Sequence, residues 1–180
     1  MHCVISSRIF NRIYSSLAYL NPQDTVVTTP TGLTYAGTSI INESEVVAVS
    51  VVRAGDSMLE SFMRICPLAS AGKILIQRDE ATALPTLFYQ KLPPLQEKYV
   101  VLLDPMLATG HTAIMAIREL LAKGASIDKL LFVNVVASPE GIAYVHSHYP
   151  TLLIITAEID QGLNEKVSLP LTDVNSYRFR

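Results

Sequence analysis

Short apolar segments of strand length recur along the chain, and helix signals separate most of them. Several are apolar at consecutive rather than alternate positions, which is typical of parallel strands buried on both faces. With helices between them, they predict an α/β fold built on an open, doubly wound, mostly parallel sheet. The predicted strands are 45–52, 73–77, 86–92, 99–104, 130–137 and 152–159.

Helix ends are marked by residues with capping or helix-breaking chemistry. Ser57 and Glu60 form a capping box ahead of Phe62, which predicts Ser57 as the N-cap of a helix. Ser138 followed by Pro139 offers an N-cap with proline at the first helical position. Gly124 predicts the end of a third helix, because glycine readily adopts the left-handed conformation that terminates helices.

The N-terminal part differs from this alternation. Apolar residues recur at helical spacing over 6–20, which predicts a helix packed by one face. Over 24–37, two β-rich arms flank a turn that contains Pro30 and Gly32, which predicts a β-hairpin arm.

Composition limits the classes of protein and partner. The chain has 180 residues, of which 49% are apolar and 17% charged, so we expect one domain over 1–180 with a large core. The net charge of −2 provides no basic field for nucleic acid, so we expect no nucleic-acid partner and only local contacts to any phosphate. Cys3 and Cys66 lie far apart, without metal-ligand spacing. No signal peptide or membrane span is visible, and a cytoplasmic protein is expected.

The strongest candidate for chemistry is the segment from Val100 to Thr112, a buried strand that ends in an acid before a loop of small residues opens a helix. Backbone N–H groups from Thr109 to Thr112 can converge on a phosphate, and the helix dipole favours an anion there. Asp104 lies where the strand leaves the sheet, and its carboxylate suits the paired hydroxyls of a ribose. An ordinary strand-to-helix turn is the alternative, and the complete segment favours the anion site.

Two arginines and a histidine are further candidates. Arg53 follows a buried strand and precedes Ala54-Gly55, which places a cation beside a backbone that an anion can approach; a surface arginine in a loop is the alternative. Arg78 precedes two acids, which on their own favour a solvated charge cluster over a binding site. His111 either adds a donor to a phosphate at low pH or points to solvent.

Several segments in the same order resemble motifs of the uracil phosphoribosyltransferase family. The segment Asp104-Pro-Met-Leu-Ala-Thr-Gly110 resembles the family's phosphoribosyl pyrophosphate loop, and Val52-Arg-Ala-Gly55 its pyrophosphate loop. The resemblance covers about residues 8 to 166, and an ordered series of motifs is more specific than any one of them. The other matching segments are Thr29-Pro-Thr-Gly32, Gly72-Lys-Ile-Leu-Ile-Gln-Arg-Asp-Glu80, Ala137-Ser-Pro-Glu-Gly-Ile142 and Ile159-Asp-Gln-Gly-Leu-Asn164.

The resemblance implies a type I phosphoribosyltransferase fold with a hairpin arm, and transfer of a phosphoribosyl group from phosphoribosyl pyrophosphate to uracil. It implies Mg²⁺ bound with the phosphoribosyl pyrophosphate, no direct protein metal site, and a homodimer or larger assembly. The implied catalytic residues are Asp104, Arg53 and Arg78. The implied phosphoribosyl pyrophosphate contacts are Arg53, Ala54, Gly55, Arg78, Asp104, Pro105, Met106, Leu107, Ala108, Thr109, Gly110, His111, Thr112 and Asp173.

The chain departs from the family pattern at both ends. It is short at the N-terminus relative to the family, which puts nucleotide regulation in doubt. The tail at 164–180 lacks the glycines that shape the family's uracil site, so we expect impaired or altered base recognition. A catalytically impaired relative that acts as a regulatory or partner protein is therefore the alternative function, and an RNA-binding regulator is disfavoured by the net charge. The implied base-binding residues are Ser168, Leu169, Thr172 and Asp173.

Overall fold

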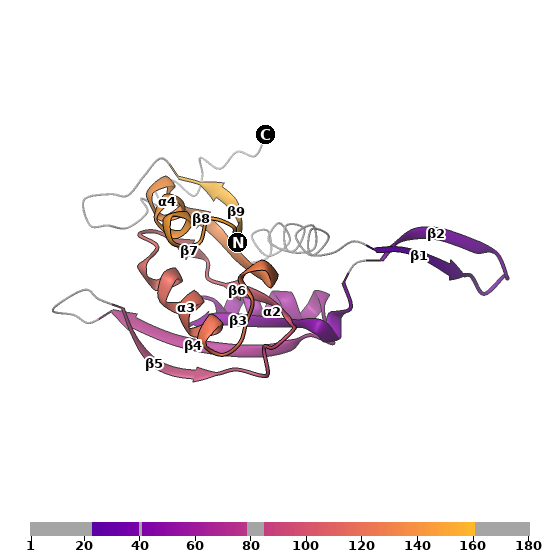
Figure 1. Ribbon diagram of the computed structural model, residues 1–180, viewed down its shortest axis with the longest axis horizontal. Helices are drawn as coiled ribbons and strands as arrows, with labels where there is room; N and C mark the ends of the chain where they lie inside the picture. Colours follow the sequence, from indigo (N-terminus) through magenta and orange to yellow (C-terminus); the bar gives the residue numbers. More distant parts are fainter. Residues whose placement is uncertain (1–22, 40, 79–84, 161–180) are drawn as a thin grey trace.

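The computed structural model describes residues 23–39, 41–78 and 85–160. Within these ranges a seven-stranded sheet has the order β5-β4-β3-β6-β8-β7 (Figure 1). Strand β9 also pairs with β8, so β8 has three partners: β6, β7 and β9. All strand pairs in this sheet are parallel except β4 with β5, which confirms the predicted mostly parallel α/β sheet. The strands are β3 (Val46–Val52), β4 (Ser70–Arg78), β5 (Pro85–Lys91), β6 (Tyr99–Leu103), β7 (Met106–Leu107), β8 (Leu130–Ala137) and β9 (Leu153–Ile159).

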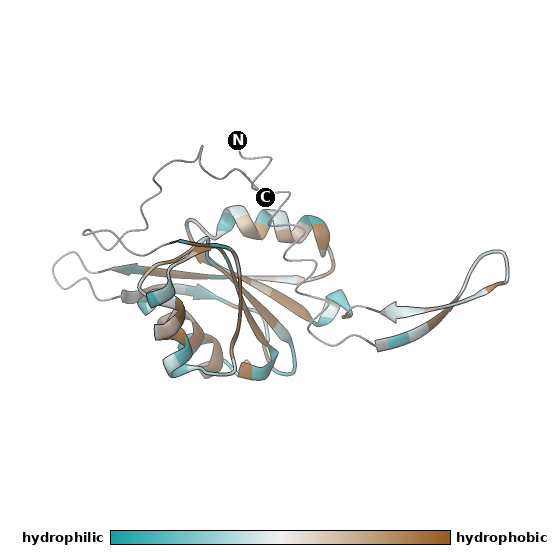
Figure 2. Cartoon of the chain, turned by 90° about the horizontal axis from the view of Figure 1, so that it is seen from above, coloured by the Kyte–Doolittle hydropathy of each residue, from teal (hydrophilic) through white to brown (hydrophobic). Residues whose placement is uncertain are grey.

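Helices cover both faces of this sheet (Figure 2). Helix α2 (Asp56–Ile65) packs on one face, against a core that includes Val46, Phe62, Val101 and Val133. Helices α3 (His111–Ala122) and α4 (Pro139–His148) pack on the other face, against a core that includes Val49, Leu102, Ile117 and Phe132. Successive side chains of a strand point to opposite faces of the sheet. Because helices cover both faces, both sets of side chains are buried, which explains the consecutive apolar positions in the sequence.

The predicted hairpin arm is present and forms a separate sheet. Strands β1 (Gln23–Thr28) and β2 (Thr34–Ser39) pair antiparallel, and Gly32 in the turn has φ 82°. In Figure 1 the arm extends away from the large sheet. Leu33 and Tyr35 are 70% and 67% exposed, so the arm carries apolar side chains that nothing in the described ranges covers.

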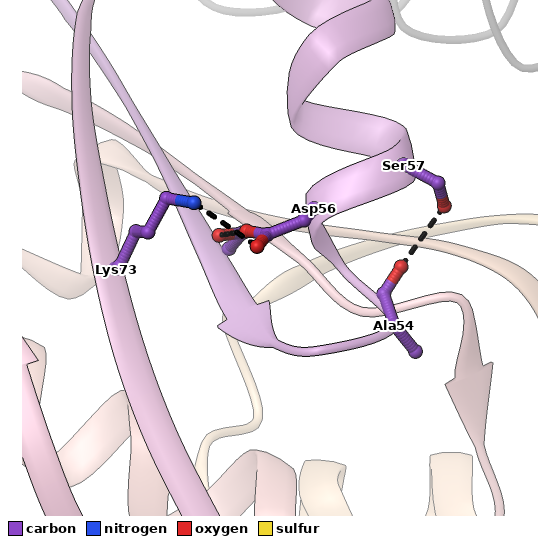
Figure 3. Close-up of polar contacts among 5 residues, drawn as sticks. Ala54, Asp56, Ser57 and Lys73 are labelled. Atoms are coloured by element: carbon purple, nitrogen blue, oxygen red, sulfur yellow. Dashed lines mark hydrogen bonds and ion pairs between the residues drawn. The ribbon is translucent and has the colours of Figure 1, made fainter.

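The helix ends confirm two of the predicted signals and correct one. Ser138 caps α4 with Pro139 at its first position, and Gly124 follows α3 with φ 95°. The capping box at Ser57 was wrong, because the N-cap of α2 is Gly55, two residues earlier, and the helix begins at Asp56. The Ser57 hydroxyl instead donates to the Ala54 carbonyl oxygen at 2.9 Å (Figure 3).

Two 3₁₀ turns, η1 (Glu43–Glu45) and η2 (Ile127–Lys129), precede β3 and β8. The predicted helix over 6–20 lies outside the described residues. Among the helices that the structure describes, none has the length and apolar character needed to cross a membrane.

Candidate functional site

The predicted phosphate-binding segments meet at one edge of the sheet. Strands β3, β6 and β8 are mutually parallel neighbours that end at Val52, Leu103 and Ala137. The carboxyl ends of parallel strands lie at the same edge, which is where open α/β sheets bind ligands. The loops that begin at Arg53, Asp104 and Ser138 are therefore brought together by the sheet.

Asp104 is the first residue after β6, where the sequence places the ribose-binding acid. Its backbone N–H donates to the Val133 carbonyl oxygen at 3.2 Å, and its Oδ1 accepts a weak hydrogen bond of 3.4 Å from the Met106 N–H. Asp104 is half-buried. This burial raises the pKa of Asp104 to about 6, against the smaller lowering effect of the Met106 hydrogen bond.

The loop after Asp104 is held by the first turn of α4. The Ser138 N–H donates to the Leu107 carbonyl oxygen at 2.8 Å, and the Ser138 hydroxyl donates to the Ala108 carbonyl oxygen at 2.6 Å. The same hydroxyl accepts from the Gly141 N–H at 2.9 Å as the N-cap of α4. A Cβ at Gly141 would overlap the Ala108 carbonyl oxygen, so only glycine permits this approach. The sequence identified Ser138 as a helix cap but gave no sign of its contacts with the loop.

Gly110 joins this loop to α3 as its N-cap, with φ 84°. A Cβ at Gly110 would lie 2.8 Å from Tyr144 Cδ1 and 3.1 Å from the Gly141 carbonyl oxygen, so α4 also requires a glycine here. The next residue, His111, is exposed, and its ring lies against Tyr144 with centroids 4.6 Å apart. The N–H groups in the first turn of α3 have no partners one turn earlier in the helix, as at any helix start, which suits them to an anion.

The loop after β3 has a similar close packing. The Val52–Arg53 peptide bond is cis, and the Gly55 N–H donates to the Val51 carbonyl oxygen at 2.9 Å. A Cβ at Gly55 would overlap the Leu103 carbonyl oxygen at the end of β6. Arg53 and Ala54 are exposed, and Arg53 forms no ion pair within the described ranges. The loop therefore presents a cation and backbone groups to solvent at the carboxyl edge.

Some predicted site residues cannot be placed. Arg78 is the last residue of β4, and its side chain is outside the described part of the chain. The predicted base-binding residues Ser168, Leu169, Thr172 and Asp173 lie outside the described residues. Within those residues, no group of three or more histidine, cysteine, aspartate or glutamate side chains is arranged to hold a metal ion.

Polar residues that the sequence analysis missed lie close to both loops. Ser50 and Asn134 are buried at 0% and 2% exposure, in β3 and β8 respectively. Neither side-chain amide atom of Asn134 has a hydrogen-bond partner in the described part, although buried amides are normally paired. Asp56 and Lys73 form an ion pair beside the Arg53 loop. The residues next to these four in the sequence form no motif, so the sequence did not indicate that the four lie near the loops.

Fold and site together define a class: α/β proteins that bind a phosphorylated ligand at the carboxyl edge of a parallel sheet. The family model for uracil phosphoribosyltransferase matches residues 5–170. The chain belongs to the uracil phosphoribosyltransferase family.

Individual relatives agree with this assignment. A uracil phosphoribosyltransferase of Dictyostelium discoideum is 46% identical over 163 residues, covering 89% of this chain and 74% of the relative. The solved AQ2163 protein from Aquifex aeolicus has a TM-score of 0.80 and 32% identity, covering 93% of this chain and 81% of that one. A purine phosphoribosyltransferase from Pyrococcus horikoshii shares the fold, with a TM-score of 0.59 and 15% identity over 88% of this chain and 83% of that one.

We predict that Ser138→Ala destabilises the protein by about 1 to 3 kcal/mol, because it removes a helix cap and leaves buried groups unpaired. The free energy of unfolding in urea measures this loss. Ser147→Ala is the matched control on the same helix: Ser147 is exposed, and its hydroxyl has solvent-exposed hydrogen bonds with the Tyr144 carbonyl oxygen and with His148 Nδ1, so a change within about 0.5 kcal/mol is expected. Equal losses in the two variants would contradict the role of Ser138.

We also predict a pH-dependent stability difference between the parent protein and Asp104→Asn. The raised pKa means that the folded state binds the Asp104 proton more tightly than the unfolded chain does. The parent should therefore be most stable, relative to the variant, below about pH 4, and lose this advantage as the pH rises through about 6. The rise from 3.8 to about 6 corresponds to a loss on the order of 3 kcal/mol. Urea unfolding of both proteins between pH 4 and 7.5 measures it, and a difference that does not vary with pH would refute the shift.

Proposed function

We propose that this chain transfers the phosphoribosyl group of phosphoribosyl pyrophosphate to uracil, which yields UMP and pyrophosphate in pyrimidine salvage. The observation that carries this function is the family match over residues 5–170, which includes both loops at the carboxyl edge. The chain is an enzyme of this family, and the family match does not favour the non-catalytic alternative.

The reaction requires the protein mainly to position the reactants and stabilise charge. A pyrimidine nitrogen attacks C1 of the ribose as the C1–oxygen bond to pyrophosphate breaks, so negative charge grows on the leaving group. Asp104 would accept hydrogen bonds from the ribose hydroxyls, and the Thr109 to Thr112 backbone would hold the 5-phosphate. Arg53 and Arg78 would stabilise the departing pyrophosphate. These roles agree with the exposure of Arg53 and with the half-buried position of Asp104 directly after β6.

Mg²⁺ is proposed to enter with phosphoribosyl pyrophosphate rather than to occupy a site made only of protein ligands. The described residues form no cluster of metal-ligating side chains, and Mg²⁺ is commonly held by substrate phosphates with few protein ligands. When bound, the ion would neutralise part of the pyrophosphate charge. Among the proposed site residues, the Asp104 carboxylate is the side-chain group best suited to contact the ion. Its ionised form is favoured above a pH of about 6.

The base-binding end rests on the sequence alone. Ser168, Leu169, Thr172 and Asp173 are proposed to contact uracil within the divergent segment 164–180, and Asp173 also to contact phosphoribosyl pyrophosphate. We further propose a single domain over 1–180, a cytoplasmic location, and no nucleic-acid or membrane partner. The net charge of −2 supports the absence of a nucleic-acid partner.

The enzyme assay is conversion of uracil to UMP by the purified full chain with phosphoribosyl pyrophosphate and Mg²⁺. We predict that Arg53→Ala weakens phosphoribosyl pyrophosphate binding by about 1.5 to 3 kcal/mol, or roughly 10- to 150-fold, since it removes a charged hydrogen bond. Arg64→Ala is the control: Arg64 is an exposed arginine of α2 that pairs with Glu60, so its loss should change the KM little. A parent protein that neither forms UMP nor binds phosphoribosyl pyrophosphate in calorimetry would overturn the proposed function.

We predict a homodimer or larger assembly, and we propose the hairpin arm as part of the contact. Val26, Leu33 and Tyr35 of the arm are 68%, 70% and 67% exposed, and apolar surface of this kind is normally buried in an interface. Light scattering at micromolar concentration should show a mass at least twice 19.7 kDa. A species of 19.7 kDa alone would refute this prediction.

A further inference from the structure

An acid lies directly after the loop that is proposed to bind pyrophosphate. Asp56 follows Gly55 as the first residue of α2, and its backbone N–H donates to the Arg53 carbonyl oxygen at 3.2 Å. A carboxylate suits the dipole of a helix N-terminus, but beside a pyrophosphate its charge is repulsive. The position therefore requires a neighbouring positive charge.

Two other elements hold the Asp56 carboxylate. The Ser50 hydroxyl of β3 donates to Asp56 Oδ1 at 2.7 Å, and Ser50 is completely buried. The Lys73 ammonium of β4 donates to Asp56 Oδ2 at 3.0 Å (Figure 3). Ser50 and Lys73 are partners in the β3–β4 register, so the sheet itself places both donors on one side of the acid.

The contacts keep Asp56 ionised. Burial acts to raise the pKa of Asp56, but the hydrogen bonds from Ser50 and Lys73, together with the Lys73 charge, lower it below its usual value. The side chains of Lys73 and Asp56 are 49% and 38% exposed, so the pair alone would contribute little to stability. The pair matters instead for the charge beside the Arg53 loop, because the positive charge of Lys73 cancels the negative charge of Asp56.

We propose that Lys73 is a positioning residue for the pyrophosphate loop: it neutralises Asp56 and, with Ser50, fixes the start of α2. It acts through Asp56 and does not itself contact pyrophosphate. Loss of Lys73 would leave an uncompensated carboxylate beside the bound anion. This inference rests on the proposed function, since it assigns the loop at Arg53 to the pyrophosphate.

The test is a double-mutant cycle in the full chain with Lys73→Met, Asp56→Asn and the double variant. Lys73→Met should raise the KM for phosphoribosyl pyrophosphate by roughly five- to fiftyfold, because of charge repulsion, with little change in kcat or in the KM for uracil. The double variant should return to within about threefold of Asp56→Asn, since no unpaired acid is left. Lys73→Arg should retain the parental KM because it keeps the charge.

Lys91→Met is the matched control. Lys91 is exposed on β5 and is the register partner of Lys73, so its loss removes the same charge from the same region without touching Asp56. Its KM should stay within about twofold of the parent. A Lys91→Met effect as large as that of Lys73→Met would overturn the proposal, because it would show a general effect of positive charge.

Two further outcomes would also overturn it. If the double variant is as impaired as Lys73→Met, Lys73 acts directly on the ligand or on folding, and not through Asp56. If Lys73→Met has the parental KM, the ion pair has no influence on the site. Calorimetry with phosphoribosyl pyrophosphate on the same four proteins separates this proposal from the proposed function, because a parent that binds the ligand but makes no UMP fails only the latter.

Discussion

The hydrogen bonds between Ser138 and the loop after β6 fix the geometry on which the rest of the site depends. With a net charge of −2, the protein has no general attraction for phosphates, so the proposed phosphate contacts are local, and in the loop after β6 they are backbone groups. Such groups are effective only if the loop keeps its shape before the ligand arrives. Ser138 supplies that rigidity from the N-cap position of α4, since it donates to the Leu107 and Ala108 carbonyl oxygens, and Gly141 allows α4 to approach the Ala108 carbonyl oxygen. The α4 N-terminus therefore determines the conformation of a loop about thirty residues earlier in the chain.

Two acids at the same edge of the sheet have opposite electrostatic environments. Asp104 is half-buried and, among the described residues, its carboxylate accepts one hydrogen bond, of 3.4 Å, while burial raises its pKa to about 6. Asp56 receives hydrogen bonds of 2.7 and 3.0 Å and the Lys73 charge, and its pKa is lowered. Within the described residues, the first acid has unused acceptor capacity that ligand hydroxyls can fill, whereas protein donors already satisfy the second. This difference separates a residue suited to bind the substrate from one suited to hold the loop.

The sequence predicted those features that local chemistry determines. Consecutive apolar residues predicted the strands, Ser138-Pro139 predicted the start of α4, and Gly124 predicted the end of α3. The start of α2 was missed because Gly55 packs against the end of β6, a contact between distant segments that overrides the local capping box. The Asp56–Lys73 pair was also invisible, because it depends on the register of β3 with β4. For Arg78 and the segment 164–180, the assignments still rest on the family resemblance alone.

The proposed phosphate loop has room for a large side chain at His111. Phosphate binding at a helix start uses backbone N–H groups, so the side chain at this position needs only to stay clear of the phosphate. The His111 ring is exposed and lies against Tyr144 of α4, with centroids 4.6 Å apart. Gly110, by contrast, cannot be replaced easily, because its φ of 84° and the nearby Tyr144 ring both exclude a Cβ. The same aromatic side chain thus excludes a side chain at one position of the loop and accommodates a large one at the next.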